Sequence, residues 1–297
     1  MNGLLVVNGY YNTQNLTALY AALQAGFAKK KLQLEIISGK EFTIALHKPK
    51  QTLTQFAVLW DKDILLARHL ELSGVRVFNS SEAVRLCDDK LLTAQILAKN
   101  NLPIPKTIAA PFTFSNIGYG GDYGFISNEL GCLGFPQVVK AAVGSLGEQV
   151  FICRSKAEAQ QAVKRIHPTR ALFQQFIDGE DIRVYVVGGQ ALGAMKRPPS
   201  CRGLPTGTSK VNNRLVTPAR NAIYERYNAR PDVLDIAVRA ANALGCDFCG
   251  VDLMVTAGKV YILEVNSNAF FNNFTAATGV DPAEHIAELV HKSLYER

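Results

Sequence analysis

The stretch CGVDLMV at residues 249–255 decides the fold of this chain, together with the run YILEVN at residues 261–266. Both runs are apolar and rich in β-branched residues, which is typical of strands. The tripeptide TAG at residues 256–258 lies between them. A three-residue loop with Gly258 in the left-handed conformation predicts an antiparallel hairpin in which Val255 pairs with Lys259.

This register gives the predicted hairpin one polar face. Asp252 is expected opposite Ile262, so that even-numbered residues share a face that carries Asp252, Glu264 and Asn266. Two carboxylates and an amide suit a hard cation such as Mg²⁺, with water and phosphate oxygens as its other ligands. An amphipathic hairpin whose polar side is only solvated is the alternative. The opposite face is expected to supply the core residues Val251, Leu253, Val255, Leu263 and Val265.

Composition narrows the class of protein. The chain has 297 residues, 48% of them hydrophobic and 19% charged, which predicts a folded chain with a large core or two to three domains. The net charge of +7 favours anionic partners such as nucleotide phosphates. The basic residues are scattered, and the run of lysines at 29–31 closes a predicted helix, so a nucleic-acid partner is not favoured. No apolar run approaches the roughly 18 residues of a membrane span, and residues 1–7 do not resemble a signal peptide.

The six cysteines are dispersed, which is consistent with a reducing cytoplasmic location. The pair Cys246-x-x-Cys249 is compatible with a zinc or redox site. No second close pair accompanies it, however, and it adjoins a predicted buried strand. Small thiols in the core are therefore the favoured interpretation.

The N-terminal part alternates strand and helix patterns. Short apolar runs at 4–7, 34–37, 56–60 and 75–78 read as strands, and helical spacing occurs between them. This alternation predicts a parallel α/β unit over roughly the first 85 residues.

Glycines and basic residues mark the middle of the chain. Asp89 and Lys90 open a predicted helix, and a segment rich in Gly and Tyr at 111–124 is expected to be a surface insertion or a flap. A strand that ends at Lys140 precedes the glycine-containing segment 144–150. This segment is compatible with a simple hairpin turn, but a strand-held lysine just before it favours a loop that binds polyphosphate.

The C-terminal third has a second hairpin and two helices. Strands are predicted at 182–187 and 190–196 around Gly188-Gly189, and a polar loop near a site follows at 197–217. Helices are predicted at 231–244 and after Asp281-Pro282, where proline occupies the first helical position.

These pieces together resemble the ATP-grasp carboxylate–amine ligases, and within them the RimK-like ribosomal-protein glutamate ligases. The resemblance runs from about residue 56 to the end. It implies a Rossmann-like N-terminal domain at 1–87, a central ATP-grasp lobe at 88–179 and a C-terminal lobe with a metal site at 180–297. The motifs that carry it are Asp89-Lys90, Gly134-Phe135-Pro136 with Lys140, Gly144-Ser145-Leu146-Gly147, Gln174-Gln175-Phe176-Ile177, Asp181-Ile182-Arg183, Met195-Lys196-Arg197, Gly250-Val251-Asp252 and Glu264-Val265-Asn266.

The resemblance also implies a set of ATP- and metal-binding residues. Lys90 and Lys140 are expected on the phosphates, under the loop that contains Gly144, Ser145 and Gly147. Gln175, Phe176 and Ile177 are expected to hold adenine, and Asp181 the ribose. Asp252, Glu264 and Asn266 are expected to bind Mg²⁺, with Mn²⁺ as the alternative metal.

The implied reaction has two steps. A carboxylate takes the γ-phosphoryl group to give an acyl phosphate, and an amine then displaces phosphate to form an amide. Arg197, Arg183 and Asn213 are the residues expected to serve catalysis, because the carboxylate and phosphates must be neutralised. A structural ion pair is the alternative for Arg183, and a solvated surface position is the alternative for Arg197.

Three departures from the family pattern lie near the expected acceptor site. Gln149 replaces the third loop glycine, the segment 210–214 with Asn213 replaces an Arg-x-Asn motif, and Ala269-Phe270-Phe271 replaces Pro-Gly. These departures leave the expected reaction class unchanged, but they weaken the expectation that the substrate is a ribosomal protein. The expected partners are small-molecule or peptide carboxylates and amines, without nucleic acid or membrane, and a homo-oligomer is left open. A dipeptide ligase of the D-alanine–D-alanine type and a catalytically silent nucleotide-binding regulator are the competing interpretations.

Overall fold

A parallel sheet forms the N-terminal part of the chain. The computed structural model describes residues 1–42, 44–47, 54–126, 132–144, 149–198, 210–211, 214–215 and 223–296. The sheet has the order β2-β1-β3-β4 with all neighbours parallel, so the predicted α/β unit is confirmed. Its elements are β1 (Asn2–Val7), α1 (Gln14–Lys29), β2 (Gln33–Ser38), β3 (Phe56–Trp60), α2 (Ile64–Leu72) and β4 (Arg76–Phe78).

Two consecutive helices lead from this sheet to the next one. Helix α3 (Ser81–Asp88) was not predicted, and α4 (Lys90–Lys99) begins where Asp89 was expected to open a helix. The Asp89 carboxylate accepts hydrogen bonds from the backbone N–H groups of Leu91 and Leu92, at 2.8 and 3.2 Å. This cap satisfies donors that a helix start otherwise leaves unpaired.

The central sheet is antiparallel and has its own core. Its order is β5-β8-β6-β7, and α6 packs on it. The segment predicted at 111–124 leads into this core, because Phe125, which follows it, meets Phe173 of β8 with ring centroids 6.2 Å apart. The elements are β5 (Thr107–Ala109), β6 (Gln137–Ala141), β7 (Val150–Cys153), α6 (Lys156–Ile166) and β8 (Ala171–Gln175).

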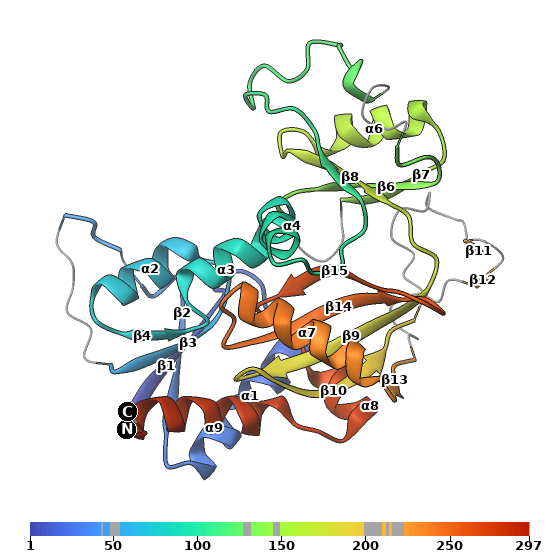
Figure 1. The fold of residues 1–297 in the computed structure, drawn as a ribbon. Helices are drawn as coiled ribbons and strands as arrows, with labels where there is room; N and C mark the ends of the chain where they lie inside the picture. Colours follow the sequence, from blue (N-terminus) through green and yellow to red (C-terminus); the bar gives the residue numbers. More distant parts are fainter. Residues whose placement is uncertain are drawn as a thin grey trace.

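The C-terminal sheet has the order β13-β10-β9-β14-β15. Helix α7 covers one face, and α8 and α9 cover the other together with α1 (Figure 1). The elements are β9 (Glu180–Val187), β10 (Gln190–Lys196), β13 (Glu225–Tyr227), α7 (Pro231–Ala243), β14 (Phe248–Val255), β15 (Val260–Asn266), α8 (Asn272–Thr278) and α9 (Pro282–Tyr295). The short strands β11 (Lys210–Val211) and β12 (Arg214–Leu215) pair separately.

The predicted register of the β14–β15 hairpin is wrong. Val255 pairs with Val260 rather than with Lys259, which leaves a four-residue loop, and Gly258 is not among the glycines with positive φ. A β-bulge at Leu263 then shifts the ladder, so that Asp252 lies opposite Glu264 instead of Ile262. The longer loop and the bulge each reverse the side-chain alternation, so their effects cancel and Asp252 and Glu264 still share a face.

The bulge also changes one core assignment. Ile262, at 1% exposure, occupies the buried position that was predicted for Leu263, which is only partly buried. Val251, Leu253, Val255 and Val265 are buried on this face as predicted.

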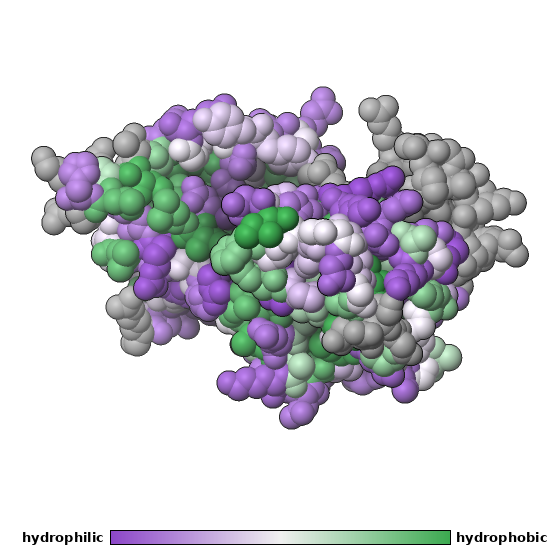
Figure 2. Space-filling view, turned by 90° about the horizontal axis from the view of Figure 1, so that it is seen from above, coloured by the Kyte–Doolittle hydropathy of each residue, from purple (hydrophilic) through white to green (hydrophobic). Residues whose placement is uncertain are grey.

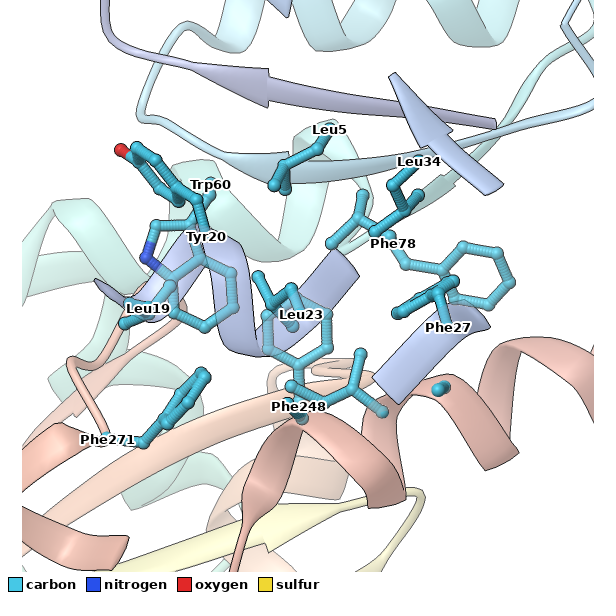
Figure 3. Packing of buried hydrophobic residues seen from close by; sticks show 14 of the residues in the cluster. Leu5, Leu19, Tyr20, Leu23, Phe27, Leu34, Trp60, Phe78, Phe248 and Phe271 are labelled. Carbon is cyan, nitrogen blue, oxygen red and sulfur yellow. The ribbon is translucent and has the colours of Figure 1, made fainter. Parts of the chain in front are cut away.

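The N-terminal and C-terminal sheets share one hydrophobic core. Trp60 of β3 stacks on Phe248 of β14 with ring centroids 5.4 Å apart, and its edge meets Phe271 at 5.6 Å (Figure 3). Figure 1 shows the central sheet standing apart from this joint body. The domain boundaries at residues 87 and 179 stay predictions.

The surface and the cysteine thiols agree with the features expected from composition. No helix among the described residues is long and apolar enough to cross a membrane. Figure 2 shows hydrophilic and hydrophobic residues intermixed on the face seen from above. Cys246 and Cys249 are buried free thiols, as predicted, and the sulfur of Cys246 lies 3.4 Å from that of Cys87.

Candidate active site

A row of charged residues crosses three adjacent strands of the C-terminal sheet. Arg183 of β9 pairs in register with Asp252 of β14, and Asp252 pairs in turn with Glu264 of β15. Two residue pairs further along, Asn266 lies opposite Gly250. The sheet therefore brings the three predicted metal ligands together, and it places Arg183 beside Asp252.

Asp252 is the centre of this row. Its side chain is fully buried, and Arg183 binds it through two parallel hydrogen bonds, Nε to Oδ1 at 2.6 Å and Nη2 to Oδ2 at 2.8 Å. Arg197 Nη1 lies 2.9 Å from the same Oδ2. A buried carboxylate is stable only with such compensation, so the ion pair considered for Arg183 is present.

Arg197 extends the network to Asp181 at the start of β9. Its Nε and Nη2 lie 2.9 and 2.7 Å from Asp181 Oδ1, and its side chain is 15% exposed, so the solvated surface alternative for Arg197 is wrong. Burial lowers the pKa of Arg197, but the charges of Asp252 and Asp181 outweigh it and the net shift is upward. Burial raises the pKa of Asp181 in spite of the Arg197 charge. The residue expected on ribose is thus an ion-pair partner of Arg197 here.

Two lysines from outside the C-terminal sheet face this network. Lys140 of β6 is 6% exposed, and Lys90 at the start of α4 donates from Nζ to the carbonyl oxygen of Gly144 at 2.9 Å. Burial would raise the pKa of Glu264, but the charges of Lys140, Lys90 and Arg197 hold it well below its usual range. Burial lowers the pKa of Lys90. The carboxylate of one sheet therefore faces the cations of the other.

The backbone ties the start of α4 to the central sheet. The N–H of Lys90 donates to the carbonyl oxygen of Ala142 at 2.8 Å, and Asp89 forms an isolated β-bridge with Val143. Lys140 is therefore carried by the central sheet, and Lys90 lies where α4, which packs on the C-terminal body through Leu97, is hydrogen-bonded to that sheet.

The residues expected around adenine lie on the connection between the two lobes. Gln175 ends β8, and Phe176 and Ile177 follow it, all three partly buried. Among the loop residues, Gly144 is described, whereas Ser145, Gly147 and Asn213 lie outside the described residues.

The side chains in the row fit a divalent cation in their chemistry. Asn266 Nδ2 lies 3.2 Å from Asp252 Oδ2 and 3.2 Å from Glu264 Oε1, so all three side chains converge. Across the described residues, no group of three or more His, Cys, Asp or Glu side chains is placed to hold a metal. Two carboxylates and one amide hold Mg²⁺ only together with phosphate and water oxygens, which is the way this ion usually binds with nucleotides.

The residue that follows β3 contacts the segment after β15, and its position had not been singled out from the sequence. The amide nitrogen of Asn268 donates to the carbonyl oxygen of Asp61 at 2.7 Å. Asp61 follows directly after β3, and polar residues just after parallel strands are a recognised signal for a ligand site. That signal was available in the sequence.

Solved structures with the same architecture define the fold. The chain resembles a RimK domain ATP-grasp protein from Sphaerobacter thermophilus, with a TM-score of 0.73 at 19% identity, covering 97% of this chain and 99% of that one. D-alanine–D-alanine ligase from Bacillus anthracis gives a TM-score of 0.76 at 21% identity, covering 99% and 97%. These similarities show the ATP-grasp fold.

Sequence similarity identifies the family to which the chain belongs. Residues 87–290 match the family model of the RimK-like ATP-grasp domain, and the chain belongs to this family. It is 33% identical over 231 residues to a protein named probable alpha-L-glutamate ligase from Stenotrophomonas maltophilia, covering 76% of this chain and 72% of that protein.

Longer relatives match as well. Beta-citrylglutamate synthase B of Danio rerio is 31% identical over 275 residues, which are 89% of this chain and 63% of the relative. Human N-acetylaspartylglutamate synthase A is 32% identical over 244 residues, which are 80% and 58% of the two chains. The chain thus spans about three fifths of the length of these two relatives.

Proposed function

We propose that this protein is an ATP- and Mg²⁺-dependent ligase that joins a carboxylate to the amino group of glutamate through an acyl phosphate. The observation that supports this most is the opposition of Lys90 and Lys140 to the row of Arg183, Asp252 and Glu264. Cations on one side and a partly paired acidic row on the other suit a metal-bound polyphosphate between them.

The chain's own residues supply most of the proposed chemistry. Lys140 and Lys90 bind phosphate oxygens, and their partly desolvated charges are worth more there than at the surface. Arg197 supplies positive charge where the carboxylate meets the γ-phosphoryl group. Asp252, Glu264 and Asn266 would hold Mg²⁺, which neutralises phosphate charge when it is bound.

Glutamate as the amine is supported by the relatives rather than by geometry. The names of all three relatives described above contain glutamate or a glutamyl product. The two synthase names contain different acyl groups, citryl and N-acetylaspartyl, and Ala269-Phe270-Phe271 departs from the family pattern near Asn266, an expected metal ligand. We therefore propose glutamate as the shared substrate and leave the carboxylate to experiment.

The test is ADP release by the purified protein with ATP, Mg²⁺ and L-glutamate. Citrate, N-acetylaspartate and a glutamate-terminated peptide are offered in turn as the carboxylate, and D-alanine alone tests the dipeptide-ligase alternative. ADP release that requires both a carboxylate and L-glutamate supports the proposal. Tight ATP binding without ADP release under any condition would identify a silent regulator instead.

Glu264→Gln provides a second test of the same proposal. We expect turnover to fall at least ~100-fold, because the metal loses a charged ligand, while ATP affinity changes much less. Glu284→Gln, at the surface of α9, is the control and should keep full turnover. Near-normal turnover of Glu264→Gln at saturating Mg²⁺ would remove Glu264 from the metal site.

A further inference from the structure

A carboxylate stands at the edge of the N-terminal sheet next to the candidate site. Val7 of β1 pairs with Trp60 of β3, so the residues that follow them, Asn8 and Asp61, emerge side by side at the carboxyl ends of parallel strands. In open α/β sheets, ligands bind at this edge.

The Asp61 carboxylate is held in a fixed orientation. Asn8 Nδ2 lies 3.2 Å from its Oδ1 and 3.4 Å from its Oδ2, and the backbone N–H of Lys62 donates to Oδ1 at 2.7 Å. Asn8 is itself fixed, because its Oδ1 accepts hydrogen bonds from the backbone N–H groups of Tyr10 and Tyr11, both at 2.9 Å. The group is therefore preorganised before any ligand arrives.

This carboxylate keeps much of its capacity to accept hydrogen bonds. Within the described part of the chain, no lysine or arginine nitrogen lies within 4.0 Å of Asp61, and the neighbouring Lys62 ammonium pairs with Asp88 instead. Burial, together with the Asp61 charge, raises the pKa of Tyr20 to about 12. A carboxylate offers roughly four acceptor positions, so Asp61 can take further hydrogen bonds, chiefly at Oδ2.

A hydrogen bond and an electrostatic effect connect the end of β3 to the candidate site. Asn268, two residues after Asn266, donates to the Asp61 carbonyl oxygen, and its own Oδ1 accepts a hydrogen bond from Ser267 Oγ at 2.8 Å. Lys62 lies close enough to Lys90 for its charge to contribute to the low pKa of Lys90, after burial. The backbone of Asp61 is thus hydrogen-bonded to the segment that follows β15, and the next residue, Lys62, lies within electrostatic reach of Lys90.

We propose that Asp61 binds the ammonium group of the amine substrate, an inference that rests on the proposed ligase function. The rest of the site is rich in cations, which repel an ammonium group. Asp252 is bound by Arg183 and Arg197, and Glu264 faces Lys140 and Lys90. Asp61 is held in a fixed orientation, and no lysine or arginine nitrogen of the described residues lies within 4.0 Å of it, so it suits the ammonium group of an amino acid better than a neutral amine.

The experiment compares two nucleophiles in Asp61→Asn. L-glutamate carries an ammonium group, whereas hydroxylamine is largely uncharged at neutral pH and captures an acyl phosphate as a hydroxamate with release of phosphate. We expect kcat/KM for L-glutamate to fall about 10- to 100-fold, with hydroxamate formation and KM for ATP unchanged. Asp63→Asn is the control, because Asp63 caps α2 through the N–H of Leu66 at 2.9 Å and asparagine caps equally well.

Each outcome decides the proposal. Equal kcat/KM for L-glutamate in Asp61→Asn and wild type would overturn it while leaving the ligase function intact. Parallel loss of the glutamate and hydroxylamine reactions would show that Asp61 supports the site as a whole, and would also overturn it. Absence of ADP release and hydroxamate in the wild type would refute the ligase function itself, and the role of Asp61 with it.

Discussion

The central sheet and the two outer sheets are built in different ways. The N-terminal and C-terminal sheets are joined by one core in which Trp60, Phe248 and Phe271 meet, whereas the central sheet packs on its own helix α6 around Phe173. The acidic row belongs to the joint body, and Lys140 belongs to the separate lobe. Lys140 and the carboxylates that it faces therefore belong to parts of the molecule that have separate cores.

The largest loss of stability is expected from a substitution in the core that joins the N-terminal and C-terminal sheets. Phe271→Ala should lower the free energy of unfolding by about 3–5 kcal/mol, since Phe271 is 2% exposed and contacts Trp60 and Tyr185. Trp60 is the single tryptophan of the chain, so its fluorescence during urea unfolding reports on this core.

The matched control for Phe271→Ala removes the corresponding ring from the central core. Phe173→Ala should leave the Trp60 fluorescence transition in place and shift part of the far-UV circular dichroism signal to lower urea. Identical shifts of the Trp60 transition in both variants would mean that the three sheets unfold as one unit.

A smaller loss of stability is expected from a substitution of Asp252, at the centre of the acidic row. Asp252→Asn should lower the free energy of unfolding by about 3 kcal/mol, because two guanidinium groups lose their buried counter-charge while the amide keeps one acceptor. Asp235→Asn, which removes an exposed carboxylate from a pair with Arg239, should have no measurable effect. Urea unfolding of both variants provides the comparison, and equal stability of Asp252→Asn and wild type would contradict a structural role for the ion pairs.

The next effect concerns the binding of ATP by Lys140, which faces the acidic row. Lys140→Met should weaken binding of ATP with Mg²⁺ by about 2 kcal/mol, roughly 30-fold, because a charged hydrogen bond to phosphate is lost. Lys99→Met, at the exposed end of α4, is the control. Titration calorimetry measures both, and an unchanged dissociation constant in folded Lys140→Met would place the phosphates elsewhere.

The smallest effect distinguishes two descriptions of the β14–β15 loop. An added Cβ at Gly258 has no neighbour within 4 Å and the residue has no positive φ, so Gly258→Ala should be neutral or stabilise by up to about 0.5 kcal/mol. Gly245 follows α7 and has a φ of 68°, so Gly245→Ala should lower the free energy of unfolding by about 1 kcal/mol. A comparable loss in Gly258→Ala would restore the three-residue loop that the sequence predicted.

That hairpin shows what local sequence can predict. Alternation of polar and apolar residues placed Asp252 and Glu264 on one face correctly, because burial of Val251, Leu253 and Val265 requires it. The loop length and the bulge at Leu263 were missed, since a glycine next to a strand does not by itself choose a turn type. Helix α3 was missed because it is short and its buried residues are few.

Contacts between distant segments were beyond the sequence patterns. The pair of Arg183 and Asp252 joins residues 69 positions apart, and only the alignment of β9 against β14 brings them together. Ala269-Phe270-Phe271 was interpreted as a change near the acceptor site. The structure also gives Phe271 a place in the joint core and lets the carbonyl oxygen of Ala269 accept a hydrogen bond from Tyr185 at 3.1 Å. Neither role has a periodic signature that could be recognised in advance.

The double pairing of Asp252 has a consequence for the order in which ligands bind. Arg183 and Arg197 are bound to its oxygens, so a metal ion that binds alone competes with two guanidinium groups for them. Among the described residues, Asp181 and Glu264 are the other carboxylates near Arg197, and Glu264 is itself an expected metal ligand. A polyphosphate bound at the same time offers those groups a new anion. Under the proposed function, Mg²⁺ and nucleotide should therefore bind with positive cooperativity, and each should raise the affinity for the other by the same factor.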